Sequence, residues 1–220
     1  MRSRVQLRQE RTRNEIVEAA LAAATETGAA SLSLGEVARR VGMRTPSLYG
    51  YFPSKAALCD EIFARGWLEL AAAMSPLYQN ASEVASEEGL HDQLTGCLAA
   101  FVGWALDHRA MSELMFWRPI QQWEPSSEAF APAVELVESL GRVLSRLQDR
   151  GLLRAEADVE EMTSVVNVLG AGVVSQQLSN EPGVPLERGR HSRHLDRLVE
   201  MFLKQYAAPP SQVARRKKVR

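Results

Sequence analysis

The chain has few cysteines, few aromatic residues and no long apolar run. Its 220 residues include two cysteines, Cys59 and Cys97, which are too few and too far apart for a disulfide framework or a CxxC metal site. No apolar stretch approaches the roughly 18 residues that cross a bilayer, and the N-terminus lacks the apolar segment of a signal peptide. These absences argue against a disulfide-rich or membrane-spanning protein and predict a cytoplasmic one with packed, reduced thiols.

Motifs of catalysis and cofactor binding are also missing. The sequence has no glycine-rich phosphate loop, no nucleophile elbow and no metal-spaced set of His, Cys and Asp. His191 and His194 have a spacing that could bind a metal, but no Cys or carboxylate cluster accompanies them, which favours two solvated side chains. We therefore expect no enzyme, no metal and no cofactor.

The net charge of −1 hides an uneven distribution along the chain. Residues 1–55 carry a net charge of +4, residues 56–206 carry −10, and the segment 207–220 carries +5 with no acidic residue. A basic end on an acidic body is typical of a protein that binds a polyanion with one end, although basic residues also keep a small helical domain soluble.

Helical periodicity runs through nearly the whole chain, and strand patterns are almost absent, which predicts an all-α fold. Glycine, proline and capping residues divide the pattern into nine helices, and Gly28 is expected to end the first of them. We expect them at about 8–28, 34–41, 45–51, 54–74, 84–107, 109–117, 127–151, 158–179 and 190–206. The predicted parts are an N-terminal DNA-binding domain over 1–55, a ligand-binding and dimerisation domain over 56–208, and a disordered basic tail over 209–220.

Two short helices joined by a tight turn predict a helix-turn-helix within residues 34–51. Ser33 and Glu36 have the spacing of a capping box, and Gly42 can adopt the left-handed conformation that ends the first helix. Thr45-Pro46 then restarts the chain as a capping hydroxyl followed by a proline at the first helical position. Pro53 ends the second helix, and Ser54 caps the next one.

The second short helix carries side chains suited to a DNA major groove. Leu48 and Phe52, four residues apart, are expected to anchor it to the core. Thr45 and Ser47 offer hydroxyls for bases or phosphates, and Lys55 lies in the first helical turn that follows, where it could hold a phosphate or be solvated. Tyr49 and Tyr51 are spaced so that at most one of them can be a core residue; the other is free for phosphate contact.

This stretch resembles the TetR/AcrR family of transcriptional regulators. The family's Leu-Tyr-x-Tyr/His-Phe-x-x-Lys-x-x-Leu pattern is matched throughout residues 48–58, and residues 16–20, 32–34 and 37–42 also fall at family spacing. The resemblance implies a nine-helix regulator with a three-helix head, in which the following residues contact operator DNA: Ser33, Thr45, Ser47, Tyr49, Tyr51 and Lys55. Arg44, in the turn, is a further candidate for a base or phosphate.

The middle of the chain gathers aromatic residues and methionines that form either plain core or a ligand cavity. A cavity lined by these side chains would suit a hydrophobic or aromatic effector. Residues 101–180 also resemble, more loosely, a C-terminal domain of such regulators, whose effectors vary too widely to imply one here. The candidate ligand-binding residues are Phe101, Trp104, His108, Phe116, Trp117, Asn167 and Gln176. The last two long helices have apolar residues over a broad part of their surface, which predicts that they form a homodimer interface. The alternative is that both helices are buried in the core of a single chain.

These observations favour a repressor that binds a palindromic operator as a dimer and is released by a small molecule. The alternative is a helical ligand-binding or scaffold protein whose helix-turn-helix contacts another protein. A steep fall of DNA binding with salt distinguishes the first from the second.

Overall fold

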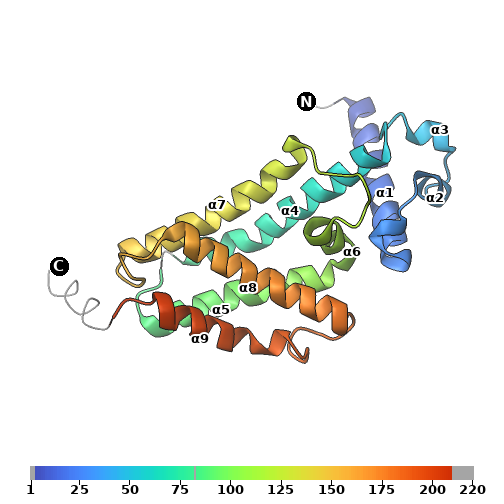
Figure 1. Cartoon of the computed structure of the whole chain (residues 1–220). Helices are drawn as coiled ribbons and strands as arrows, with labels where there is room; N and C mark the ends of the chain where they lie inside the picture. The colour runs from blue at the N-terminus through green and yellow to red at the C-terminus, as the bar shows by residue number, and fades with distance from the viewer. Residues whose placement is uncertain (1–2, 82, 210–220) are drawn as a thin grey trace. The chain divides into compact units, whose positions relative to one another are not determined.

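The computed structural model describes residues 3–81 and 83–209, and these residues form nine α-helices and no strand (Figure 1). The all-α fold with nine helices is therefore confirmed. The helices are α1 (Arg4–Thr27), α2 (Leu34–Arg40), α3 (Thr45–Leu48), α4 (Lys55–Asn80), α5 (Glu87–Asp107), α6 (Arg109–Ser112), α7 (Ser127–Asp149), α8 (Val159–Asn180) and α9 (Leu195–Tyr206). The expected tail at 209–220 lies, except for Pro209, outside the described residues.

The chain divides into two compact units. Unit 1 consists of Met1–Leu68 and His108–Pro132, and unit 2 of Glu69–Asp107 and Ala133–Arg220. Helices α4 and α7 contribute residues to both units. The predicted functional boundary after residue 55 does not coincide with either unit's limits, and it stays a prediction.

Unit 1 is built around the inner face of α1. Ile16, Val17 and Ala20 are buried there at helical spacing, and they belong to the same core as Leu48 and Phe52. A second group of rings surrounds Phe63 on α4, with Trp123 and Phe130 each 5.9 Å from it between ring centroids. The indole Nε1 of Trp123 donates to Asp60 Oδ1 over 2.9 Å, so this buried ring has a satisfied polar atom.

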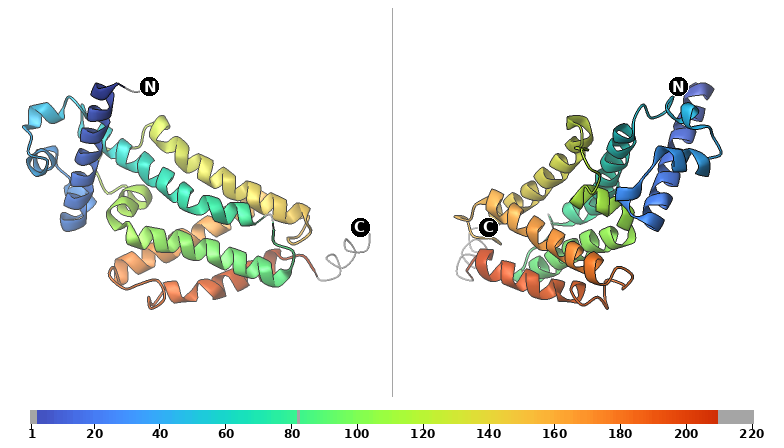
Figure 2. Two further views of the ribbon diagram at one scale, coloured as in Figure 1. Left: turned by 180° about the vertical axis from the view of Figure 1, so that it is seen from behind. Right: turned by 45° about the vertical axis from the view of Figure 1, so that its right-hand side comes forward.

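In unit 2, α5 packs against both α8 and α9, and Figure 2 shows the three helices side by side. Gly170 permits the close approach of α8 to α5, because a Cβ there would lie 3.0 Å from a ring carbon of Phe101. The segment before α9 is held by Gln177, whose buried side chain accepts hydrogen bonds from the backbone N–H groups of His191 and Ser192.

Several helix ends differ from those expected. The first helix begins at Arg4, earlier than expected, because Ser3 and Gln6 form a capping box. Helix α4 continues through Pro76 to Asn80. Proline removes the bond to the carbonyl of Ala72, but Ala72 is exposed, so water can replace it. The last helix begins at Leu195, after a short 3-10 turn at Ser192–His194.

The predicted turn residues are confirmed in part. Gly28 and Gly42 have φ values of 81° and 68°, and the hydroxyl of Ser54 accepts from the N–H of Ala57 at 3.0 Å. The capping box at Ser33 and Glu36 is wrong, because Ser33 makes no side-chain cap bond. The expected cap by Thr45 is also wrong, since Arg44 is the N-cap residue and Thr45 is the first residue of α3.

The expected single helix over 109–117 is two different structures. Helix α6 ends at Ser112, and Glu113–Trp117 form a π-helical turn. The turn ends at Arg118, which has a left-handed φ of 46°. Such π turns and left-handed residues without a glycine are uncommon and gather at functional sites.

Candidate functional site

The helix-turn-helix consists of α2, the turn Val41–Arg44 and α3. The turn is closed by a backbone bond from the N–H of Met43 to the carbonyl of Ala38, 3.0 Å long, and Gly42 supplies the positive φ that this reversal needs. After α3, the N–H groups of Tyr51 and Phe52 both donate to the carbonyl of Leu48. The second short helix is therefore continued by one tight turn before Pro53.

Burial separates the two faces of this segment. Leu48 is 0% and Phe52 1% exposed, which confirms both as anchors. On the outer side Arg44 and Ser47 are exposed and Tyr49 is 50% exposed. Thr45, Tyr51 and Lys55 are partly exposed, and Ser33 is exposed just before α2. The structure thus brings all seven predicted DNA-contacting residues to accessible positions on or beside the helix-turn-helix.

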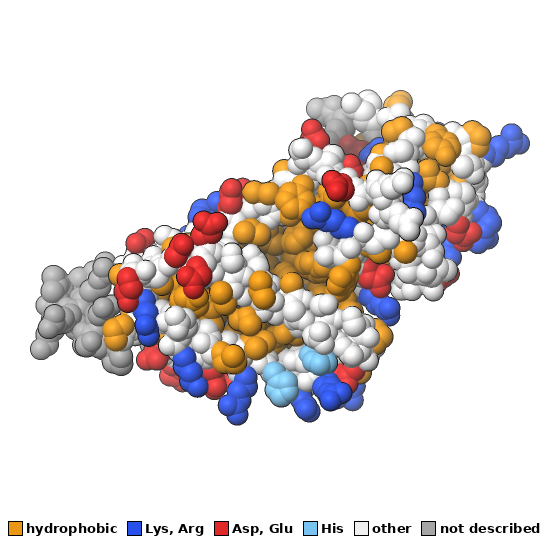
Figure 3. Space-filling model, viewed as in Figure 1, with side chains coloured by type: hydrophobic (Ala, Val, Ile, Leu, Met, Phe, Trp, Pro, Cys, Tyr) orange, Lys and Arg blue, Asp and Glu red, His pale blue; other side chains and the backbone are white. Residues whose placement is uncertain are grey.

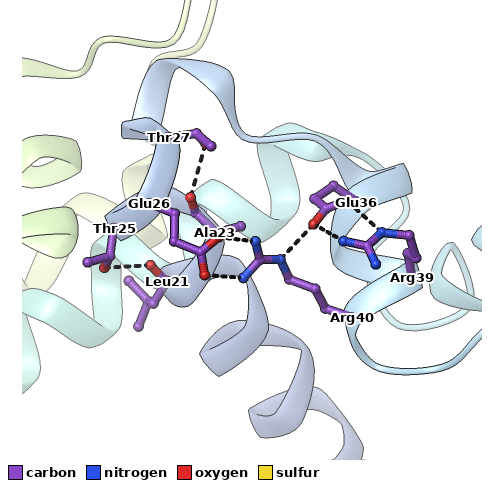
Figure 4. A network of polar contacts seen from close by, with 8 residues as sticks. All are labelled: Leu21, Ala23, Thr25, Glu26, Thr27, Glu36, Arg39 and Arg40. Carbon is purple, nitrogen blue, oxygen red and sulfur yellow. Dashed lines mark hydrogen bonds and ion pairs between the residues drawn. The ribbon is translucent and has the colours of Figure 1, made fainter.

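The two arginines at the end of α2 belong to an ion-pair network (Figure 4). Glu36 bonds to Arg39 and Arg40, and the Arg40 guanidinium also binds both carboxylate oxygens of Glu26 on α1. Hydrogen bonds from Arg39 and then Arg40 lower the pKa of the Glu36 carboxyl to about 2. The network joins α2 to α1 and balances the charge of both arginines.

Arg13, which the sequence did not single out, holds the far end of the helix-turn-helix. Its guanidinium donates 2.7 Å to the carbonyl of Tyr51 and 2.5 Å to Glu61 Oε2 on α4, and its Cζ lies 4.3 Å from the centre of the Phe52 ring. One side chain of α1 thereby fixes the turn that carries Tyr51 and leads to Lys55 at the start of α4. No local motif predicts this, because Arg13 and Tyr51 are 38 residues apart.

Two family models match most of the chain. The model for bacterial regulatory proteins of the tetR family matches residues 16–62, and that for the tetracyclin repressor-like C-terminal domain matches residues 94–204. The chain belongs to the TetR family. It is a DNA-binding transcriptional regulator by this membership, and its family is one of regulators and not of enzymes.

Solved structures share the TetR fold with this protein over most of their length. A putative TetR-family transcriptional regulator from Mesorhizobium loti is 21% identical, with a TM-score of 0.67 over 91% of this chain and 99% of that one. FadR from Bacillus subtilis, solved in complex with stearoyl-CoA, is 14% identical, with a TM-score of 0.65 over 86% and 96%. The ketosteroid transcriptional regulator KstR2 of Mycobacterium tuberculosis is 20% identical, with a TM-score of 0.59 over 90% and 96%. No curated protein matches.

The residues expected to line a ligand cavity fall into both units of this TetR-family protein. In unit 1, His108 precedes α6, and Phe116 and Trp117 lie in the π turn with ring centroids 6.0 Å apart. The Phe116 ring also packs 5.6 Å from Trp67 on α4, a residue that the sequence-based set omitted.

In unit 2, the candidate ligand residues lie on two packed helices. Phe101 and Trp104 are on α5, and Asn167 and Gln176 are on α8. The Gln176 side chain is exposed, and the neighbouring Gln177 is the buried amide. A shallow groove of about 270 Å³ between the end of α4 and α7 contains none of these residues. The predicted ligand set stays a prediction.

The predicted dimer helices present apolar side chains at their surface. Val168 on α8 is 70% exposed and Met201 on α9 is 63% exposed. Figure 3 shows hydrophobic side chains gathered over α8 in the face that is drawn. Both helices also bury side chains against α5, so their apolar surface is wider than the core of one chain uses.

Metal-binding clusters and membrane-spanning helices are both absent from the part of the chain that the structure describes. Within residues 3–81 and 83–209, no group of three or more His, Cys, Asp and Glu side chains could hold a metal ion. In the same residues, no helix has the length and apolar character needed to cross a membrane.

Proposed function

We propose that this TetR-family protein is a repressor that binds a palindromic operator as a homodimer and leaves it when a small hydrophobic or aromatic effector binds. The observation that supports DNA binding is that the α3 segment has one buried apolar face and one accessible polar face. Fully buried Leu48 and Phe52 fix its depth, and polar side chains occupy the accessible face.

The accessible residues divide by the atoms they offer. Thr45 and Ser47, at the start of α3, are assigned to base edges, because a recognition helix meets the bases with its N-terminal residues. Tyr49, Tyr51, Lys55 and Ser33 flank them and are assigned to phosphates, which position the protein without reading sequence. Arg44 precedes α3 and is assigned to a base or a phosphate.

The dimer would use α8 and α9, whose exposed Val168 and Met201 extend their apolar surface. A dimer with two-fold symmetry presents two helix-turn-helix units and therefore requires a DNA site with the same symmetry. The centres of its two half-sites should lie about one turn of the DNA helix apart, roughly 34–36 Å, or slightly more.

The effector class rests on the aromatic side chains of the predicted ligand set and on two relatives. FadR of B. subtilis was solved with stearoyl-CoA, which carries a long apolar acyl chain, and KstR2 is a ketosteroid transcriptional regulator. An effector releases DNA only if it binds more tightly to the conformation whose two heads do not fit the operator. The coupling should be about 1–3 kcal/mol, and DNA must weaken the effector by the same factor.

The test of DNA binding measures the affinity for duplex DNA against salt concentration. Lys55→Ala should weaken binding to specific and nonspecific DNA alike and reduce the salt slope by about 1 for each phosphate that is no longer bound. Arg188→Ala, which removes an exposed arginine of unit 2 outside α8 and α9, is the control and should leave the slope unchanged. A wild-type protein whose DNA binding does not depend on salt would favour the scaffold alternative and refute the proposal.

The effector part is tested by titrating stearoyl-CoA and a ketosteroid with and without operator DNA. An inducer must bind less tightly when the operator is present. Equal affinity in both titrations would show that the compound is not an inducer.

A further inference from the structure

The arginines of residues 3–68 differ in whether they form an ion pair with a carboxylate. Arg11 pairs with Glu15, Arg13 with Glu61, Arg39 with Glu36, Arg40 with Glu26 and Glu36, and Arg65 with Glu18. Arg4, Arg8, Arg44 and Lys55 form no ion pair with any described residue. Arg44 and Lys55 already belong to the helix-turn-helix. Arg4 and Arg8 are positive charges that neither the core nor the helix-turn-helix uses.

Arg4 and Arg8 lie on one stripe of an uncovered helix. They are four residues apart and Arg11 follows three residues later, so all three extend from the same side of α1. Residues 3–11 are all exposed, and even Val5 and Leu7 are 67% and 52% exposed. The first two turns of α1 therefore contribute almost nothing to the core, and packing does not explain why the helix extends there.

The electrostatics of this helix end favour an external anion. Ser3 and Gln6 satisfy backbone groups at the helix start, so the segment is held as a helix without a ligand. The first turn contains no acidic residue to balance the positive end of the helix dipole. Arg4 adds a positive charge at the end where a positive charge is least favourable. A bound anion would supply the missing counter-charge.

The same end of unit 1 carries the helix-turn-helix. Figures 1 and 2 show the first turns of α1, the short α3 and the start of α4 at one end of this unit. Arg13 ties α1 to the carbonyl of Tyr51 and to α4. At about 1.5 Å of rise per residue, Arg8 and Arg4 lie roughly 8 and 14 Å further along α1 than Arg13. They therefore extend past the turn that carries Tyr51.

We propose that Arg4 and Arg8 form a second DNA contact, which binds backbone phosphates beside the base pairs that α3 reads. A guanidinium suits this role because its planar donors match phosphate oxygens in pairs and it is always charged. The contact adds affinity but no sequence preference, since phosphates are the same at every base pair. The inference rests on the proposed DNA binding.

The experiment measures binding of the full chain to a mixed-sequence 40-base-pair duplex at several salt concentrations. The variant is Arg4→Ala/Arg8→Ala, and alanine is the best helix former, so α1 keeps its helix. The charge-matched control is Arg188→Ala/Arg193→Ala, which removes two exposed arginines of unit 2. Lys55→Ala serves as the reference for a helix-turn-helix contact.

The proposal expects the slope of log Kobs against log salt to fall by about 0.9 for each phosphate that the Arg4/Arg8 variant no longer binds. The control should keep the wild-type slope, and base preference should be the same in all variants. A wild-type slope in the Arg4/Arg8 variant, with a reduced slope in Lys55→Ala, would overturn this inference and leave the proposed function standing. Absence of DNA binding by the wild-type protein would overturn both.

Discussion

Arg13 is expected to matter for DNA binding although it is not among the residues assigned to DNA. Replacing it with alanine removes three interactions at once: the bond to the carbonyl of Tyr51, the ion pair with Glu61 and the contact with the Phe52 ring. The loop between α3 and α4 would then lose its link to α1, and Tyr51 and Lys55 would be held less firmly.

The magnitude follows from these contacts. A hydrogen bond from a charged donor contributes about 1.5–3 kcal/mol. The ion pair adds about 0–1 kcal/mol, because its side chains are 38% and 41% exposed and water screens them. The contact with the ring adds about 0.5–1 kcal/mol. Because the three share one guanidinium and do not add fully, we expect Arg13→Ala to lower the free energy of unfolding by about 2–4 kcal/mol.

The assay combines denaturant unfolding with DNA binding against salt. Arg11→Ala is the matched control, since its pair with Glu15 is a surface pair on the same helix and should contribute less than about 0.5 kcal/mol. Arg13→Ala should reduce DNA affinity while keeping the wild-type salt slope, because every phosphate-binding side chain is still present. A variant as stable as Arg11→Ala, or one with the reduced slope of Lys55→Ala, would refute this reasoning.

Three other predictions follow from single side chains. The pKa of Glu36 in the folded protein is about 2, below its usual 4.5, so its carboxylate stabilises the fold fully above pH 4.5 and loses this effect as the pH falls toward 2. The urea midpoint of Glu36→Gln should therefore change less between pH 4.5 and pH 2 than that of the wild type. Gly66→Ala should lower the free energy of unfolding by about 1–3 kcal/mol, because the added Cβ would lie 2.4 Å from Met115 Sδ and 2.8 Å from Met111 Cγ. Gly96→Ala is its control: the added Cβ meets no atom within 4 Å, so this variant should raise the free energy of unfolding by about 0.5–1 kcal/mol in the same assay. Trp123→Phe should lower the free energy of unfolding by about 1–3 kcal/mol more than Trp67→Phe. Only Trp123 loses a hydrogen bond, to Asp60, because Trp67 Nε1 has no partner among the described residues. Equal losses in the two variants would contradict this.

The sequence predicted what depends on local pattern. Helical periodicity indicated the nine helices, and the glycines at 28 and 42 and the serine at 54 marked three of their ends. The anchors Leu48 and Phe52 followed from their spacing alone. Local pattern failed where a side chain had a partner elsewhere in the fold. Glu36 was assigned to a capping box, but it binds Arg39 and Arg40, whose guanidinium groups attract a carboxylate more strongly than a backbone N–H does.

Two parts of the candidate site could not be predicted from local pattern. The Arg13 clamp joins segments far apart in the sequence, and the π turn at Glu113–Trp117 looked like ordinary helix. Within one unit, the turn brings Phe116 next to Trp67, which is far from it along the chain. The sequence alone showed that residues 1–55 are basic. Only the ion pairs of the structure show which of their arginines have no carboxylate partner among the described residues.

Capture of genomic DNA on the purified protein, followed by sequencing and footprinting of the enriched fragments, tests most directly whether this is a dimeric, operator-specific regulator. The prediction is one short inverted repeat, protected as a pair of half-sites about one helical turn, roughly 10–10.5 base pairs, or slightly more apart. Fragments without a shared sequence, or a single half-site bound by a monomer, would contradict it.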